Sequence, residues 1–115
     1  MEESARGTRT NLLDVLVWFS DLEEQRRSQA DSPDIGVPEA MFGFWDDFYL
    51  VGTRVFEIAF NESERRVLYD FNEICGEVYQ AIPSRFPLLE EFIAMPEWEK
   101  LARAARDALE RLGVR

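Results

Sequence analysis

Residues 42–49 constrain the fold of this chain more than any other stretch. This segment places five aromatic side chains and two adjacent carboxylates within eight residues. On a helix the aromatic side chains occupy more than one face, because they stand at Phe42, Phe44, Trp45, Phe48 and Tyr49. A helix that is apolar on several sides must be wrapped by other helices or must leave part of its surface for a partner. We therefore expect the segment to be a core element, an interaction surface, or both.

Apolar residues recur at helical spacing over most of the chain, whereas strand-like alternation is rare. Pro83 is placed to end the third helical stretch, and Pro96 to start the last one. The pattern predicts main helices at residues 12–29, 38–60, 62–82 and 96–112, and a short helix at residues 88–93. The sequence thus predicts an all-α compact bundle of four main helices plus a short helix, in a single domain over residues 1–115 with residues 1–9 frayed.

Residues 51–60 are the ambiguous part of this assignment. They are rich in β-branched and aromatic side chains, and Gly52 lowers the helix propensity of the stretch. A short strand or a break near Gly52 is the alternative, and we favour a long or broken helix that ends near Phe60. The next helix has a clear start, because Asn61 as N-cap and Glu64 three residues later form a capping box.

The chain is long enough to form a core without a metal or a disulfide. A domain of 115 residues buries roughly two-thirds of the surface that its unfolded chain exposes. Eight large apolar residues at core-facing helical positions are expected to meet in that core, namely Leu16, Phe19, Phe56, Phe71, Val78, Trp98, Leu101 and Leu109.

The charge of the chain is strongly negative and unevenly distributed. It has 23 acidic and 13 basic residues, a formal net charge of −10. Residues 31–64 carry eight acidic side chains against Arg54 alone, a net charge of −7, whereas residues 100–115 carry five basic and two acidic ones, a net charge of +3. Nucleic acids and anionic membranes repel such a chain, so we expect neither as a partner.

The composition also indicates a cytoplasmic protein. Cys75 is the only cysteine, so no intrachain disulfide forms and a reducing compartment is compatible. The first residues are acidic and lack the apolar core of a signal peptide. The longest apolar stretch, near residues 12–19, is interrupted by Asp14 and falls short of the roughly 20 residues of a membrane-spanning helix.

Most catalytic chemistry is missing from the sequence. The chain has no histidine, which removes histidine bases, histidine metal ligands and serine or cysteine nucleophiles activated by histidine. Glycine-rich phosphate-binding motifs are also absent. The helical spacing of Asp70, Glu73 and Glu77 permits a shared carboxylate face, but a solvated face opposite an apolar stripe has the same pattern. We therefore predict a protein that is not an enzyme, with no catalytic residues, no metal and no cofactor.

The two aspartates of the aromatic segment are the best candidates for a functional surface. The simpler interpretation is a core helix whose aspartates face water. The competing one is an interface, in which carboxylates attract a basic partner and a nearby aromatic side chain anchors it. The predicted partner-binding residues are Trp45, Asp46, Asp47 and Tyr49, together with the acidic loop residues Asp31, Asp34 and Glu39.

Several short stretches give the chain a resemblance to a known class of proteins. Phe44-Trp45-Asp46-Asp47-Phe48, residues 67–72 and residues 95–98 resemble segments of small acidic bacterial immunity proteins of contact-dependent-inhibition and polymorphic-toxin systems. The resemblance implies an antitoxin-like protein that binds and neutralises a cognate protein toxin, often a basic nuclease. The alternative is a helical adaptor or scaffold subunit that assembles through the aromatic segment, for example as a homodimer. A small metal-binding protein that uses Asp70, Glu73 and Glu77 is a third, weaker alternative.

We expect removal of divalent metal to leave the protein unchanged, because the sequence offers no clustered ligand set. Elemental analysis of the purified protein and thermal melts with and without a chelator test this expectation. One tightly held divalent ion per chain, or a large drop in melting temperature with chelator, would contradict it.

Overall fold

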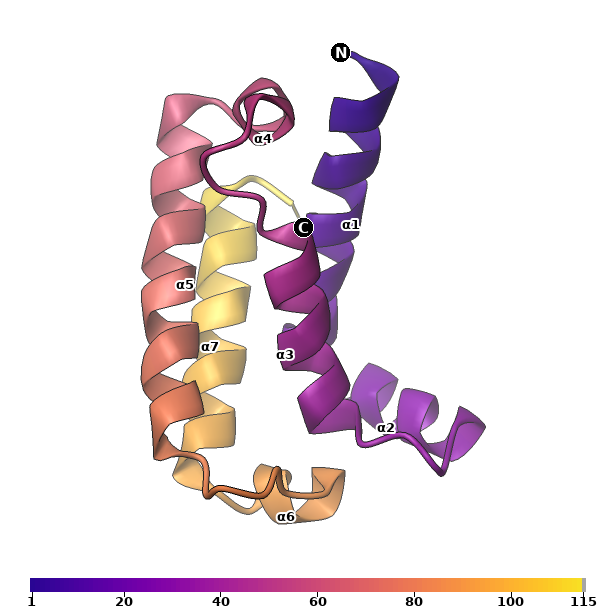
Figure 1. The fold of residues 1–115 in the computed structure, drawn as a ribbon. Helices are drawn as coiled ribbons and strands as arrows, with labels where there is room; N and C mark the ends of the chain where they lie inside the picture. Colours follow the sequence, from indigo (N-terminus) through magenta and orange to yellow (C-terminus); the bar gives the residue numbers. More distant parts are fainter. Residues whose placement is uncertain (115) are drawn as a thin grey trace.

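Four long helices run along the molecule, and three shorter ones lie at its ends (Figure 1). The computed structural model describes residues 1–114, and within them the regular structure is helical throughout. The helices are α1 (Glu3–Ser20), α2 (Leu22–Asp31), α3 (Val37–Phe48), α4 (Arg54–Ala59), α5 (Glu62–Ala81), α6 (Leu89–Ile93) and α7 (Pro96–Arg111). The predicted all-α class is confirmed. No helix within residues 1–114 combines the length and the apolar composition that a bilayer-spanning segment needs.

Residues 1–114 form seven helices where we expected five, because two of the predicted main helices are each divided in two. The first division falls at Asp21, whose backbone is extended and whose side chain accepts a hydrogen bond from the Glu24 amide at 3.1 Å. Gln25 then turns back and donates from Nε2 to the carbonyls of Trp18 (2.8 Å) and Phe19 (3.1 Å), at the end of α1. These carbonyls have lost their helical partners, so the corner is stabilised by satisfying them. Leu22 keeps the apolar spacing of α1 just past Asp21, and the residues after it are mostly good helix formers, so the sequence did not reveal the corner.

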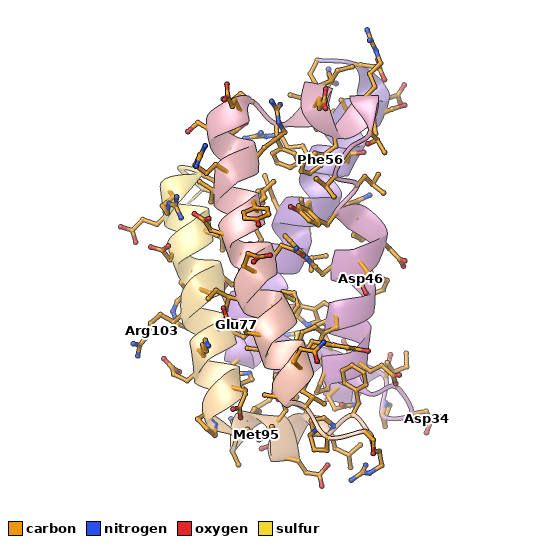
Figure 2. The ribbon with its side chains drawn as sticks, turned by 60° about the vertical axis from the view of Figure 1, so that its left-hand side comes forward. Asp34, Asp46, Phe56, Glu77, Met95 and Arg103 are labelled. Carbon is orange, nitrogen blue, oxygen red and sulfur yellow. The ribbon has the colours of Figure 1, made fainter. Side chains whose placement is uncertain are left out.

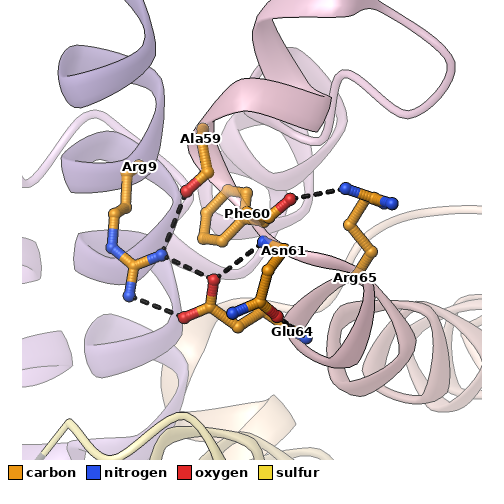
Figure 3. Close-up of polar contacts among 6 residues, drawn as sticks. All are labelled: Arg9, Ala59, Phe60, Asn61, Glu64 and Arg65. Carbon is orange, nitrogen blue, oxygen red and sulfur yellow. Dashed lines mark hydrogen bonds and ion pairs between the residues drawn. The ribbon is translucent and has the colours of Figure 1, made fainter. Parts of the chain in front are cut away.

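The predicted fraying of residues 1–9 is wrong, because α1 begins at Glu3 and Ala5 is fully buried. Figure 3 shows what holds this end in place: the Arg9 guanidinium donates to both carboxylate oxygens of Glu64 (3.0 and 2.8 Å) and to the carbonyl of Ala59 (3.0 Å). The guanidinium also lies 5.2 Å from the centre of the Phe60 ring. A bidentate arginine–carboxylate pair of this kind is among the stronger polar contacts in proteins. Its partners lie at least 50 residues away in the sequence, beyond the reach of local patterns.

The ambiguous residues 51–60 are helical after a break. Gly52 has φ +87°, a left-handed conformation that favours glycine, and ends the connection from α3. Thr53 then caps α4, since its hydroxyl oxygen accepts from the Phe56 amide at 3.3 Å. The predicted capping box at the start of α5 is confirmed: the Glu64 amide donates to Asn61 Oδ1 (2.8 Å) and the Asn61 amide to Glu64 Oε1 (2.9 Å).

The predicted core residues meet in one cluster, with one exception at its edge. All are buried except Trp98, which is partly exposed and packs against the cluster while its indole Nε1 donates to Gln25 Oε1 at 2.9 Å. Phe71 of α5 lies at the centre of the aromatic packing, with ring centroids 5.5 Å from Phe19 and 4.7 Å from Trp45. The core therefore joins α1, α3 and α5 through rings that interlock.

We expect Phe71→Ala to lower the free energy of unfolding by about 3–5 kcal/mol, because it removes a buried ring and leaves a cavity. Chemical denaturation followed by circular dichroism measures this loss. Tyr69→Ala is the matched control on the same helix, since the Tyr69 side chain is 54 % exposed. A loss below about 1 kcal/mol for Phe71→Ala would show that the ring does not hold the core together.

Candidate protein-binding surface

Helix α3 is rotated so that its aromatic side chains divide between the core and the surface. Its buried face consists of Val37, Pro38, Met41, Phe42 and Trp45. Successive residues on a helix are about 100° apart, so the neighbours of Trp45 cannot share its environment. Phe44 on one side and Asp46 on the other are exposed, and so is Asp47. The segment is therefore both a core element and a surface.

Trp45 is buried behind the polar groove that Asp46 lines, so the expectation of an exposed Trp45 ring as a partner contact is corrected. Its side chain is 1 % exposed, and its ring packs edge-on against Phe71. The indole Nε1 donates to Asn72 Oδ1 at 2.9 Å, so the buried polar atom is also satisfied. Core packing and this hydrogen bond explain the position, because a tryptophan with a satisfied N–H is stable in a protein interior.

Tyr49 lies at the border between core and surface. Its ring stacks on Trp45 at 5.0 Å and meets Phe56 edge-on at 5.5 Å, and the side chain is partly exposed. Burial, followed by the neighbouring Tyr69 and Glu73, raises the pKa of the Tyr49 hydroxyl above its usual value. The exposed edge of Tyr49 lines a groove of about 570 Å³ between the α3–α4 connection and α5.

The predicted acidic residues are all exposed. Asp31 ends α2, Asp34 lies in the following loop, Glu39 is in the first turn of α3, and Asp46 and Asp47 lie near its end. Figure 2 shows Asp34 and Asp46 along one edge of the molecule, with Arg103 of α7 at the opposite edge. Within residues 1–114, none of these five carboxylates forms an ion pair.

The carboxylates that face α7 are in a different situation, because they are paired. Lys100 contacts Glu77 at 2.7 Å and Arg111 contacts Asp70 at 3.2 Å, both between α5 and α7. Glu73, which lies between these two acids in the sequence, has no such partner in the described part of the chain and turns toward α3. The three acids of the weaker metal hypothesis are thus separated, and residues 1–114 contain no group of three potential ligands arranged to hold a metal.

Asp46 and Glu73 line opposite sides of a polar groove of about 370 Å³ between α3 and α5. The α5 side of this groove also contains Asn72, Gly76 and Tyr79. Asn72, Gly76 and Tyr79 were not among the predicted site residues. Local spacing cannot relate them to Asp46, since they come from a different helix, and the one available signal was a polar Asn72 beside the apolar stripe of α5.

Comparisons with protein families, with curated proteins and with solved structures find no match for this chain. The candidate site is the surface along α3. It combines unpaired carboxylates with partly exposed aromatic rings, which is a composition suited to recognising a cationic surface.

We expect Cys75 to be unreactive in the folded protein. Its side chain is 4 % exposed, and burial, followed by the charge of Asp46, raises the pKa of the thiol to about 12. The reactive thiolate is therefore scarce at neutral pH, and reagent access is blocked. A disulfide reagent at about pH 8 should react at least about 100-fold more slowly with the native protein than with the protein in denaturant. Rapid, stoichiometric reaction of the native protein would contradict this expectation, and Cys75→Ser gives the background rate.

Proposed function

We propose that this protein acts by binding a basic protein and covering part of its surface, as bacterial immunity proteins and antitoxins do. The observation that carries the proposal is that some acidic side chains form ion pairs and others do not. Acidic side chains between α5 and α7 have cationic partners, whereas Asp31, Asp34, Glu39, Asp46 and Asp47 have none within residues 1–114. A set of carboxylates without ion pairs in the described residues attracts a partner of opposite charge.

The chemistry of the partner follows from this edge and from the net charge of −10. A protein that binds or cleaves nucleic acid carries a basic surface to contact phosphates. The acidic edge of α3 resembles nucleic acid in charge, so it occupies that surface and excludes the substrate. The proposed partner is therefore a cognate toxin domain with a basic face, and this protein contributes no catalytic group, metal or cofactor to the complex. The proposal places the complex in the cytoplasm, where a free Cys75 stays reduced.

Self-assembly as an adaptor or scaffold is the second candidate, and exposed apolar side chains favour it. Phe44 is 44 % exposed and Val17 is 40 % exposed. An assembly of identical copies through this face brings unpaired carboxylates such as Asp47 close to their own counterparts. Like charges at an interface are repulsive, which makes a basic partner the better occupant.

We expect the double substitution Asp46→Asn with Asp47→Asn to slow association with the partner by about 3–10-fold at low salt and to flatten the salt dependence of the rate. Exposed charges act mainly on encounter, and salt screens them. The partner to test first is the purified product of the neighbouring reading frame, with association followed by stopped-flow fluorescence or surface plasmon resonance.

Glu97→Gln with Glu110→Gln is the matched control, since it removes two carboxylates of α7 that have no ion pair within residues 1–114, and it should leave the rate nearly unchanged. Circular dichroism and thermal melts on the same samples establish that both double variants are folded. If the aspartate variant is folded and keeps the full association rate and its salt dependence, this edge is not the binding surface. Trp45→Ala is unsuitable for this experiment, because its burial makes loss of stability the first effect.

A further inference from the structure

The side of α3 opposite the polar groove forms an apolar groove against α1. Phe44 stacks on Phe48 with ring centroids 5.9 Å apart and an interplanar angle of 7°, and it tilts against Trp18 at 5.8 Å. With Val15 and Val17 of α1 these rings line a groove of about 510 Å³. Phe44 and Val17 are 44 % and 40 % exposed, so the groove presents apolar surface to the solvent. Surface of this kind, enclosed between two helices, is typical of a site that receives apolar side chains.

Trp18 lines this groove and has one polar atom without a partner. Its indole Nε1 is buried and has no acceptor within residues 1–114. The other two tryptophans are satisfied, because Trp45 donates to Asn72 and Trp98 donates to Gln25. A buried donor without an acceptor is unfavourable and calls for an explanation.

Gly43 exposes the backbone of α3 on the ridge between the two grooves. It lies in the interior of the helix, and a Cβ added there meets no atom within 4 Å, so packing inside the chain does not require glycine. Glycine in a helix is unfavourable relative to alanine. A close approach of another chain is one advantage that glycine offers, and Gly43 precedes Phe44 about 100° around the helix.

The rim of the apolar groove is acidic. Asp14 lines it from α1, and Asp47 lies one turn from Phe44 on α3. Both are exposed, and the described residues offer neither of them a cationic partner. Glu24 is the other acid of the rim, and it is paired with Arg27. The charge therefore selects a cationic occupant and disfavours a second copy of this chain, whose groove has the same acidic rim.

We propose that the groove between α1 and α3 docks an amphipathic, cationic helix of the basic partner. Apolar side chains of that helix pack against Phe44, Val17 and Trp18, its lysine or arginine side chains face Asp14 and Asp47, and its backbone passes close to Gly43. This inference rests on the proposed function and deepens it, because it assigns the anchor of the complex. The carboxylates speed encounter, whereas the buried apolar contact slows dissociation.

A synthetic peptide tests this proposal without the natural partner. The probe is a helix of about 18 residues, roughly 27 Å long, with leucine on one face and lysine on the other. One control peptide replaces leucine by serine and keeps the charge, and a second replaces lysine by glutamate and keeps the apolar face. Binding is followed by isothermal titration calorimetry and by the three indole N–H signals in ¹⁵N nuclear magnetic resonance spectra.

We expect the leucine–lysine peptide to bind, and to shift the Trp18 indole signal more than those of Trp45 and Trp98. Phe44→Ser should weaken the affinity by about tenfold or more, as loss of an aromatic anchor does. Val51→Ser is the matched control, since Val51 is 61 % exposed but lies outside the groove, and it should leave the affinity unchanged. Val17→Ser replaces Phe44→Ser as the test if the latter proves unfolded.

A matched pair of glycine-to-alanine substitutions tests the role of Gly43. Gly43→Ala and Gly7→Ala both replace an exposed helical glycine whose surroundings are open, so both should raise the melting temperature. Only Gly43→Ala should weaken the affinity for the peptide, by about threefold, because it adds an atom where the peptide helix approaches α3. Equal effects of the two substitutions on affinity would remove Gly43 from the contact.

Three results would overturn the proposal. They are equal binding of the serine control peptide, unchanged affinity of folded Phe44→Ser, and a native dimer that Phe44→Ser dissociates, which would make a second copy the occupant. A second combination separates the two proposals. If the aspartate double variant loses partner association while Phe44→Ser keeps its peptide affinity, the proposed function stands and the groove is not the docking site. Weaker peptide binding by Phe44→Ser, with full salt dependence of partner association in the aspartate double variant, would support the groove and refute the acidic edge.

Discussion

The burial of Trp45 is the constraint on which the arrangement of this protein depends. The indole ring packs against Phe71 and stacks with Tyr49, while its N–H donates to Asn72 of α5. Packing alone allows a helix some freedom to rotate, but a buried donor that must reach one acceptor fixes the rotation as well. Once Trp45 is fixed, the helical repeat directs Phe44 toward α1 and Asp46 toward α5. A single core residue thus determines what each side of α3 presents to a partner.

Polar side chains at the helix ends define the corners of a bundle held together without a disulfide. Gln25 is fully buried, and it satisfies two carbonyls of α1 while accepting from Trp98 of α7. At the other end of the molecule Arg9 and Glu64 connect α1 to α4 and α5. Both clusters satisfy backbone groups that helix ends leave free, so they stabilise the turns and orient the helices together.

The distribution of ion pairs gives the two sides of the bundle different properties. Lys100 and Arg111 of α7 pair with Glu77 and Asp70 of α5, so these two carboxylates are screened by an adjacent charge. Along α3 the carboxylates are unpaired within residues 1–114, so their potential extends into the solvent. The apolar groove lies beside this edge, at Phe44. Long-range attraction and short-range apolar contact therefore meet on one helix, which suits a protein that must both find a partner quickly and hold it.

The sequence by itself determined the helical class, the capping box at Asn61, the helix from Pro96 and nearly all of the core, because these features depend on local spacing and on residues within a few positions of each other. It left open whether residues 42–49 form core or interface. Only the tertiary structure decided that Trp45 is inside, that Asp46 faces Glu73, and that the first helix turns at Asp21. The physical reason is that an aromatic segment with several apolar faces fits more than one rotation. Contacts with residues far along the chain, such as Asn72 for Trp45 and Glu64 for Arg9, select one of them.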